Sequence, residues 1–210
     1  MSHMTWATAA VTFAISIFSV ACQSGGVGDP CVPEDEYQKY TSGYAVSEVD
    51  QETKSFQCET RLCLVNHFQG RVSCPYGQLE AKATDTNYPA EKEYQLCHIP
   101  GTSGAANRIQ VQVNPQLDGR RASDTVYCSC RCDGADANAR YCKCPSGFSC
   151  EKLIERVGAL PEKELAGSFC IKDGTKYDTK NPNDGAPCSA TKPDAPANEP
   201  PGSCGLYNGQ

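Results

Sequence analysis

Hydrophobic and polar positions alternate most regularly in residues 125–132, where Cys128, Cys130 and Cys132 occupy every second position. Because successive side chains of a strand point to opposite faces, Val126 and the three sulfurs share one face. This pattern predicts a half-buried β-strand. Residues two apart in a strand are too distant for most disulfide bridges, so we expect the three cysteines to reach three different partners.

Other stretches also read as strands. Residues 61–65 and 70–77 suggest two short strands joined by a loop. Residues 107–114 alternate with Ile109, Val111 and Val113 inward, and the turn at 115–120 predicts an antiparallel hairpin with residues 126–132. Residues 167–171 predict a further short strand, whose Cys170 we expect to be tied back to the cysteine cluster.

One segment has helical spacing. Leu153, Ile154, Val157 and Leu160 recur at intervals of three or four, and Pro161 follows them. This predicts a short helix over residues 151–160.

The N-terminal residues 5–21 carry no charge, which predicts a secretory signal peptide over residues 1–21. The sequence Ser19-Val20-Ala21-Cys22 resembles the bacterial lipobox, whose cysteine becomes the lipid-bearing first residue of the mature chain. Residues 22–30 would then be a flexible, Gly-rich tether. Ser19 and Ala21 also fit ordinary signal cleavage, which would give a secreted product without lipid. We favour lipidation of Cys22, because a cysteine stands directly at the expected junction.

Cysteine usage indicates an oxidising compartment. The chain has 15 cysteines, and no two are spaced as in the Cys-x-x-Cys pairs of zinc sites. If Cys22 carries lipid, an even number remains, and we expect disulfides at these positions: Cys31, Cys58, Cys63, Cys74, Cys97, Cys128, Cys130, Cys132, Cys142, Cys144, Cys150, Cys170, Cys188 and Cys204. The first five and the next seven are odd counts, so at least one bridge must join the two segments. We therefore expect one disulfide-stapled domain over 31–175, and a Pro-rich tail over 176–210 closed by a Cys188–Cys204 bridge.

Composition favours covalent stapling over an ordinary core. Leu, Ile, Val and Phe make up only 27 of the 189 residues from Cys22 onward, while the net charge of −6 is modest. We predict a small, disulfide-rich, mainly β, loop-rich fold with one short helix. The acidic balance argues against nucleic acid as a partner.

Candidate chemistry is sparse. The sequence has no nucleophile elbow, no His-Glu-x-x-His, no phosphate-binding loop and no haem motif next to His98. Residues 133–138 and 173–178 have oxygen ligands at the density of calcium loops but lack the final glutamate, and we interpret them as turns. Residues 34–36 and 162–164 read as solvated charge. We therefore predict no catalytic residue, no cofactor and no metal.

Short phrases along the chain carry a resemblance: Gly28-Asp-Pro-Cys31, Arg71-Val-Ser-Cys-Pro-Tyr-Gly77, Tyr127-Cys-Ser-Cys-Arg-Cys132, Cys144-Pro-Ser-Gly-Phe-Ser-Cys150 and Gly167-Ser-Phe-Cys170. They are similar to phrases in Cys-rich predicted lipoproteins of myxobacteria and related bacteria. Locally, residues 142–150 resemble the second half of an EGF-like module. The wider resemblance implies a bacterial cell-envelope location and no particular activity.

These observations lead to one main expectation and two alternatives. We expect a non-enzymatic outer-membrane or cell-surface lipoprotein, attached to the membrane through lipid on Cys22, with a structural or binding role toward a protein or polysaccharide. The first alternative is a secreted disulfide-rich inhibitor or toxin-like module. The second is a redox or metal-binding protein, which requires an accessible reduced cysteine or a bound metal.

Overall fold

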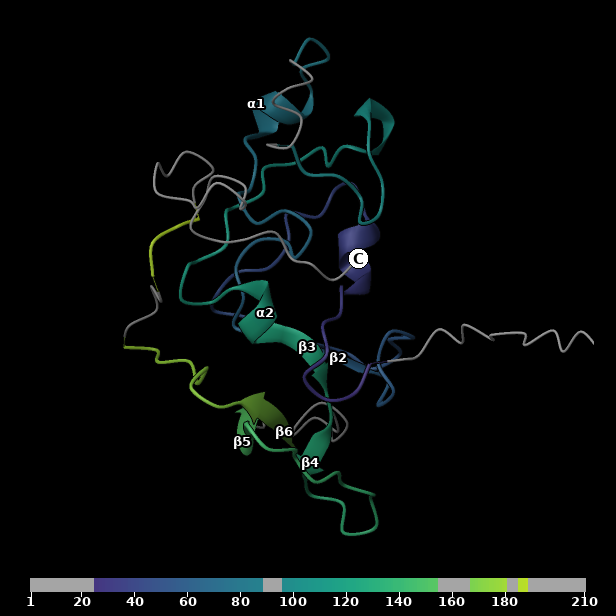
Figure 1. The fold of residues 1–210 in the computed structure, drawn as a ribbon, viewed down its shortest axis with the longest axis vertical. Helices are drawn as coiled ribbons and strands as arrows, with labels where there is room; N and C mark the ends of the chain where they lie inside the picture. Colours follow the sequence, from purple (N-terminus) through teal and green to yellow (C-terminus); the bar gives the residue numbers. More distant parts are fainter. Residues whose placement is uncertain (1–24, 89–95, 155–166, 181–184, 189–210) are drawn as a thin grey trace, which may run out of the picture.

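The computed structural model describes residues 25–88, 96–154, 167–180 and 185–188 (Figure 1). Within these ranges the chain forms two three-stranded antiparallel sheets, connected by loops and turns and cross-linked by six disulfides. The two sheets follow one another along the long axis of the molecule, as Figure 1 shows. The predicted fold class is therefore confirmed: disulfide-rich, mainly β and loop-rich.

The first sheet has the order β1 (Val49–Glu52), β2 (Leu62–Asn66), β3 (Val126–Ser129). β2 confirms the strand predicted at 61–65, and all five of its residues are buried. β3 confirms most of the strand predicted from alternation, but both of its faces are covered. The expectation of a half-buried strand is therefore wrong, because Val126 and Cys128 pack into one hydrophobic cluster and Tyr127 into another.

The second sheet has the order β4 (Arg131–Asp133), β6 (Gly167–Lys172), β5 (Phe148–Ile154). β4 follows β3 after a single residue, so one stretch of chain serves both sheets. The Ser129 hydroxyl donates to the Cys170 carbonyl at 2.8 Å, and the Lys172 amide donates to the Tyr127 hydroxyl at 2.9 Å. Tyr127 also packs with Phe169 of β6, which joins the two sheets through a shared apolar cluster. β6 confirms the strand predicted at 167–171.

The helices in the described ranges are single turns: η1 (Glu34–Tyr37), α1 (Glu80–Ala83), η3 (Ala105–Asn107) and α2 (Ala122–Thr125). The helix expected at 151–160 is wrong for residues 151–154, which belong to β5; residues 155–160 lie outside the described ranges. β5 pairs with β6 in a register that places Cys150 opposite Cys170. Backbone pairing and the nearby disulfides thus override a helical spacing that rests on few apolar residues.

Two predicted strands are replaced by turns and isolated bridges. Residues 70–77 turn repeatedly, with Gly70 and Gly77 at φ of +86° and +62°, which a continuous strand does not accommodate. Residues 107–114 make isolated bridges at Arg108 to His98 and at Val113 to Gln78. Ile109 and Val113 are buried as expected. The hairpin predicted with residues 126–132 is nevertheless wrong, because β3 pairs with β2.

Residues 25–30, expected to be part of a flexible tether, are hydrogen-bonded to the body. The Gly25 amide donates to the Gln57 carbonyl at 2.7 Å, and the Glu59 amide donates to the Gly25 carbonyl at 2.8 Å. The Cys128 amide donates to the Asp29 carbonyl at 2.7 Å. The folded part therefore begins no later than Gly25, because these bonds fix the segment against β3 and the loop before β2.

Most of the expected Pro-rich tail lies outside the described ranges. Its residues 186–188 are fastened to the body by two backbone hydrogen bonds. The Asp118 amide donates to the Ala186 carbonyl, and the Cys188 amide donates to the Gln116 carbonyl. In the part of the chain that the structure describes, no helix is long and apolar enough to cross a membrane.

Candidate functional site

The predicted disulfide cysteines are the best-defined candidate residues. The structure pairs twelve of them as Cys31–Cys63, Cys58–Cys128, Cys74–Cys97, Cys130–Cys142, Cys132–Cys150 and Cys144–Cys170. Cys128, Cys130 and Cys132 have three different partners, as their spacing predicted. Cys58–Cys128 joins the two segments with odd cysteine counts, as parity required. Cys170 returns to the cysteine cluster through Cys144.

The remaining cysteines are only partly described. Cys188 is buried and disulfide-bonded. Its predicted partner Cys204 lies outside the described residues, as does the predicted lipidation residue Cys22. The Cys188–Cys204 pairing and the lipid on Cys22 therefore stay predictions.

A recess of about 250 Å³ lies beside the Cys74–Cys97 bridge. Its apolar wall includes Val32, Val72, Leu96 and Ile99, and its polar wall includes Ser73, His98 and Thr102. A concave surface that mixes apolar area with a few polar groups is the usual form of a binding site. The recess is therefore the main candidate for a small ligand or for a protruding side chain of a partner.

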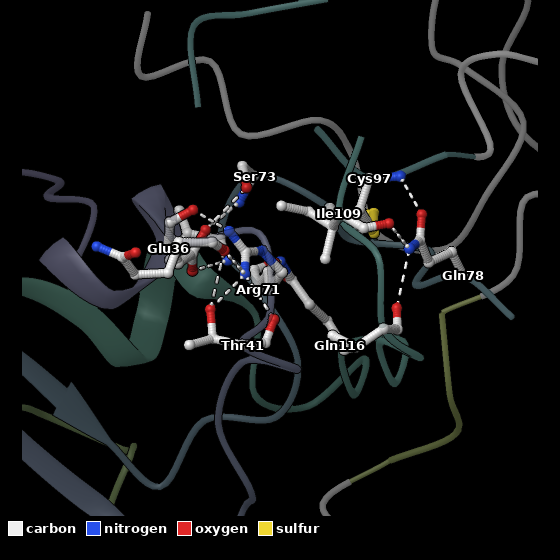
Figure 2. Close-up of a disulfide and its surroundings, with 12 residues drawn as sticks. Glu36, Thr41, Arg71, Ser73, Gln78, Cys97, Ile109 and Gln116 are labelled. Carbon is white, nitrogen blue, oxygen red and sulfur yellow. Dashed lines mark hydrogen bonds between the residues drawn. A yellow bond between two sulfur atoms is a disulfide. The ribbon is translucent and has the colours of Figure 1, made fainter. Parts of the chain in front are cut away.

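A buried glutamate stands behind the polar wall of this recess. Glu36 of η1 has no exposed surface, and its carboxylate accepts hydrogen bonds from the Val72 amide and from both the amide and the hydroxyl of Ser73 (Figure 2). Burial raises the pKa of Glu36, while the Arg71 charge and these hydrogen bonds oppose the rise. Because the Ser73 hydroxyl donates to Glu36, it is held in place as a wall of the recess. The prediction that residues 34–36 form a solvated face is wrong for Glu36.

Arg71 is the cationic partner of this arrangement and is also fully buried. Its guanidinium donates to the backbone carbonyls of Glu36 and Thr41 and to the Thr41 hydroxyl, as Figure 2 shows. Burial lowers the Arg71 pKa, and the nearby Glu36 charge opposes this. Arg71 therefore ties η1 and the 38–41 turn to the loop that carries Ser73.

The far side of the disulfide is held by Gln78. Its side-chain amide donates to the carbonyls of Ile109 and Val111 at 2.7 and 2.9 Å, and its carbonyl accepts from the Cys97 amide at 2.7 Å (Figure 2). A single buried side chain thus satisfies backbone groups that a strand partner would otherwise satisfy. Gln78 thus holds residues 109 and 111 in place although they belong to no regular strand.

Sequence reasoning missed these three buried polar residues. Glu36 stands in an acidic run, Arg71 within a stretch that reads as a strand, and Gln78 beside a turn. None of these contexts distinguishes a buried polar side chain from a solvated one. The only available signal is the glycine on either side of residues 71–76, which marks tight turns and hence a stretch whose backbone needs side-chain partners.

A second hollow, of about 220 Å³, is lined by residues that include Asp35, Tyr40, Tyr44 and the buried Glu36. Burial raises the pKa of the Tyr44 hydroxyl, and the charges of nearby carboxylates, Asp50 first, raise it further. Burial likewise raises the pKa of Asp50, opposed by a hydrogen bond from the Gln51 amide.

His67, one of the two histidines after residue 22, has a structural role. Its ring stacks on Tyr177 with 3.9 Å between centroids, and its Nδ1 lies 3.0 Å from the Val46 carbonyl. Burial lowers the His67 pKa, and the Arg120 charge acts in the same direction. Arg120 donates to the carbonyls of His67, Asn66 and Thr175, which fastens the segment after β6 to the first sheet.

The two calcium-like stretches contain turns at 137–138 and 173–174, and Asp133 is the last residue of β4. The Asp133 carboxylate accepts from the Gly134 amide at 2.8 Å, and the Asp136 carboxylate accepts from the Asn138 amide at 2.9 Å. The Asp173 carboxylate accepts from the Ser149 hydroxyl at 2.6 Å. These carboxylates serve local hydrogen bonds.

Comparison with protein-family models, with curated proteins and with solved structures found no match to this chain. The resemblance to myxobacterial lipoproteins therefore rests on the sequence phrases alone. The fold and the bridges define the class: a small disulfide-rich protein, consistent with a secreted or surface module.

Proposed function

We propose that this chain is a lipoprotein of the bacterial cell envelope, anchored in the outer membrane by lipid on Cys22 and acting as a non-enzymatic structural or binding component. The observation that carries the proposal is the disulfide framework. Six bridges tie loops to the strands of two small sheets, join strands within one sheet or link loops to one another, and such a framework forms and persists in oxidising compartments such as the periplasm and the cell surface.

The start of the folded body supports an anchor at this position. Gly25 is already hydrogen-bonded to the loop before β2, and Cys22 stands three positions earlier in the sequence. Cleavage before Cys22 would therefore remove the uncharged leader and leave the described body intact. The lipobox-like sequence then supplies the attachment point.

The recess beside Cys74–Cys97 supports binding as the role of the body. Its polar wall is held by the buried Glu36 and Arg71, whose hydrogen bonds run mainly to backbone groups. A wall fixed in this way presents a constant shape to a partner, which favours recognition. A protein side chain or a polysaccharide unit at the cell surface suits a recess with both apolar and polar walls.

The intact mass of the protein taken from its native membrane tests the proposal. The protein is alkylated without reduction, beside a Cys22→Ser variant as the control. We expect a chain that begins at Cys22, carries added acyl mass and takes up no alkyl groups, and a variant without acyl mass. A wild-type product without acyl mass would overturn the anchor in favour of a secreted module. Alkylated cysteines would overturn the fully bridged framework in favour of redox chemistry.

A further inference from the structure

Three disulfides lie close together at the end of the molecule formed by the second sheet. We call them the bridge cluster: Cys130–Cys142, Cys144–Cys170 and Cys132–Cys150. The Sγ atom of Cys170 lies 3.6 Å from that of Cys130 and 3.7 Å from that of Cys142. These distances join sulfurs of different bridges, and they place Cys170 against both atoms of the neighbouring bond.

The other end of the central bridge also lies near a neighbouring bridge. The Sγ atoms of Cys132, Cys144 and Cys150 all lie within 4.8 Å of one another. The Cys144–Cys170 bridge therefore lies between the other two and is adjacent to both. The six sulfurs form a continuous path.

Exposure changes along this path. Cys150 is exposed and Cys132, Cys142 and Cys144 are half-buried, whereas Cys130 is 7% exposed and Cys170 is fully buried. Cys150 is thus the most accessible cysteine of the cluster to a thiol in solution, and Cys170 is the least accessible.

We infer that the bridge cluster is a thiol–disulfide exchange site, which accepts a small external thiol at Cys150 and passes the resulting free thiolate inward. Exchange proceeds by attack of a thiolate on a disulfide sulfur, so it requires adjacent sulfurs and a deprotonated thiol. The geometry supplies the first requirement at both ends of the central bridge.

The steps balance without an oxidant or a reductant other than the thiol itself. The external thiolate bonds to Cys150 and breaks the Cys132–Cys150 bond, which leaves Cys132 as a thiolate. Cys132 then bonds to Cys144 and releases Cys170. Cys170 bonds to Cys130 or Cys142 and releases the other. Each step breaks one S–S bond and forms one, so the number of disulfides stays the same and the incoming thiol remains as a mixed disulfide.

The external thiol meets the second requirement, because it enters as a thiolate. Each exchange step then releases another thiolate, so no further deprotonation is needed along the path.

The other described bridges are matched controls. Cys31, Cys58 and Cys128 also bring three sulfurs within 4.8 Å, but all three residues are buried, so no external thiol reaches them. Cys74–Cys97 belongs to no such sulfur group within the described ranges. The bridge cluster therefore differs from the rest in combining contact between bridges with exposure.

The experiment adds a limiting amount of glutathione to the oxidised wild-type protein, quenches with acid, alkylates under denaturing conditions and maps the products by mass spectrometry. We expect glutathione on Cys150 and alkyl label on Cys130, Cys142 or Cys170 in addition to Cys132. Label confined to Cys132 would overturn the inference. Label spread equally over all cysteines would do so as well, because it would indicate global unfolding.

Two variants sharpen the result. Cys150→Ser frees Cys132 without any added thiol, and we expect label to move to the inner cysteines. In the control, Cys97→Ser frees Cys74, and we expect label to stay there. Removing the central bridge with Cys144→Ala and Cys170→Ala should abolish labelling of Cys130 and Cys142 when glutathione is added. Inner labelling that persists without the central bridge would contradict the path.

Discussion

Glu36 and Arg71 lie 35 positions apart in the chain and are both buried, and Arg71 donates to the backbone carbonyl of Glu36. The Glu36 carboxylate in turn accepts from the two residues that follow Arg71. Each residue thus satisfies backbone groups of the other's segment. Loss of either side chain leaves the other's charge buried, together with unpaired backbone groups, which is a severe change in a small protein.

The first prediction concerns the stability that this pair provides. Glu36→Gln keeps the shape but replaces one acceptor oxygen by an NH₂ group, which cannot accept from the Val72 or Ser73 amide. We expect the free energy of unfolding to fall by about 1–3 kcal/mol at neutral pH, measured by urea denaturation under non-reducing conditions. The exposed Glu34→Gln is the control, with an expected change below about 0.5 kcal/mol. Equal effects of the two variants would contradict a structural role for Glu36.

The second prediction concerns pH. The pKa of Glu36 is raised above its ordinary value of 4.5 by burial, so the folded state holds this proton more tightly than the unfolded chain. Its contribution to stability is therefore complete below the unfolded pKa and is lost as pH rises through the folded pKa. We expect the difference in unfolding free energy between wild type and Glu36→Gln to shrink as pH rises from 4.5. A difference that grows with pH would mean that the Arg71 charge lowers the pKa instead.

The third prediction isolates a steric contact. A Cβ added at Gly70 would lie 2.4 Å from the Asn114 carbonyl oxygen, whereas a Cβ at Gly104 would meet nothing within 4 Å. The two glycines have nearly equal φ, +86° and +82°, so alanine is strained at both to a similar degree. We expect Gly70→Ala to destabilise by about 1–3 kcal/mol more than Gly104→Ala, by thermal or chemical unfolding. Similar losses of unfolding free energy in the two variants would show that backbone strain, and not the steric contact with Asn114, determines the effect.

The fourth prediction ranks two bridges. Cys58–Cys128 spans a sequence separation of 70 and joins two buried residues, whereas Cys132–Cys150 spans 18 near the surface. In the chain-entropy account these bridges contribute about 4 and about 3 kcal/mol, and removing the buried pair also leaves a cavity. We expect the variant with Cys58→Ala and Cys128→Ala to have a lower denaturation midpoint than the variant with Cys132→Ala and Cys150→Ala. The reverse order would mean that these bridges do not stabilise the protein mainly by restricting the unfolded chain.

Most of the correct predictions came from the spacing and number of the cysteines. The alternation around Cys128 predicted separate partners, and the odd counts required a bridge such as Cys58–Cys128. These predictions succeeded because strand geometry and parity act on the cysteines directly, whatever the loops do. The strand at β2 was visible for a similar reason, since its apolar residues form a short run bounded by polar ones.

The rest depended on contacts that are distant in sequence. Leu153 and Ile154 fit a helical spacing and a strand equally well, and only pairing with β6 decides between the two. Glu36 looked solvated because its partners follow about 35 positions later. Gly70 pairs with the distant Tyr44, and Gln78 bonds to distant backbone groups through its side chain, and no local sequence pattern predicts either contact.

The fastening of Gly25 to the loop before β2 limits the reach of the molecule. Three residues from Cys22 to Gly25 span at most about 10 Å even when fully extended. A body attached to lipid at Cys22 is consequently held within that distance of the head groups and cannot extend outward to capture a remote partner. If Cys22 carries lipid, a partner would therefore have to meet this body close to the membrane surface.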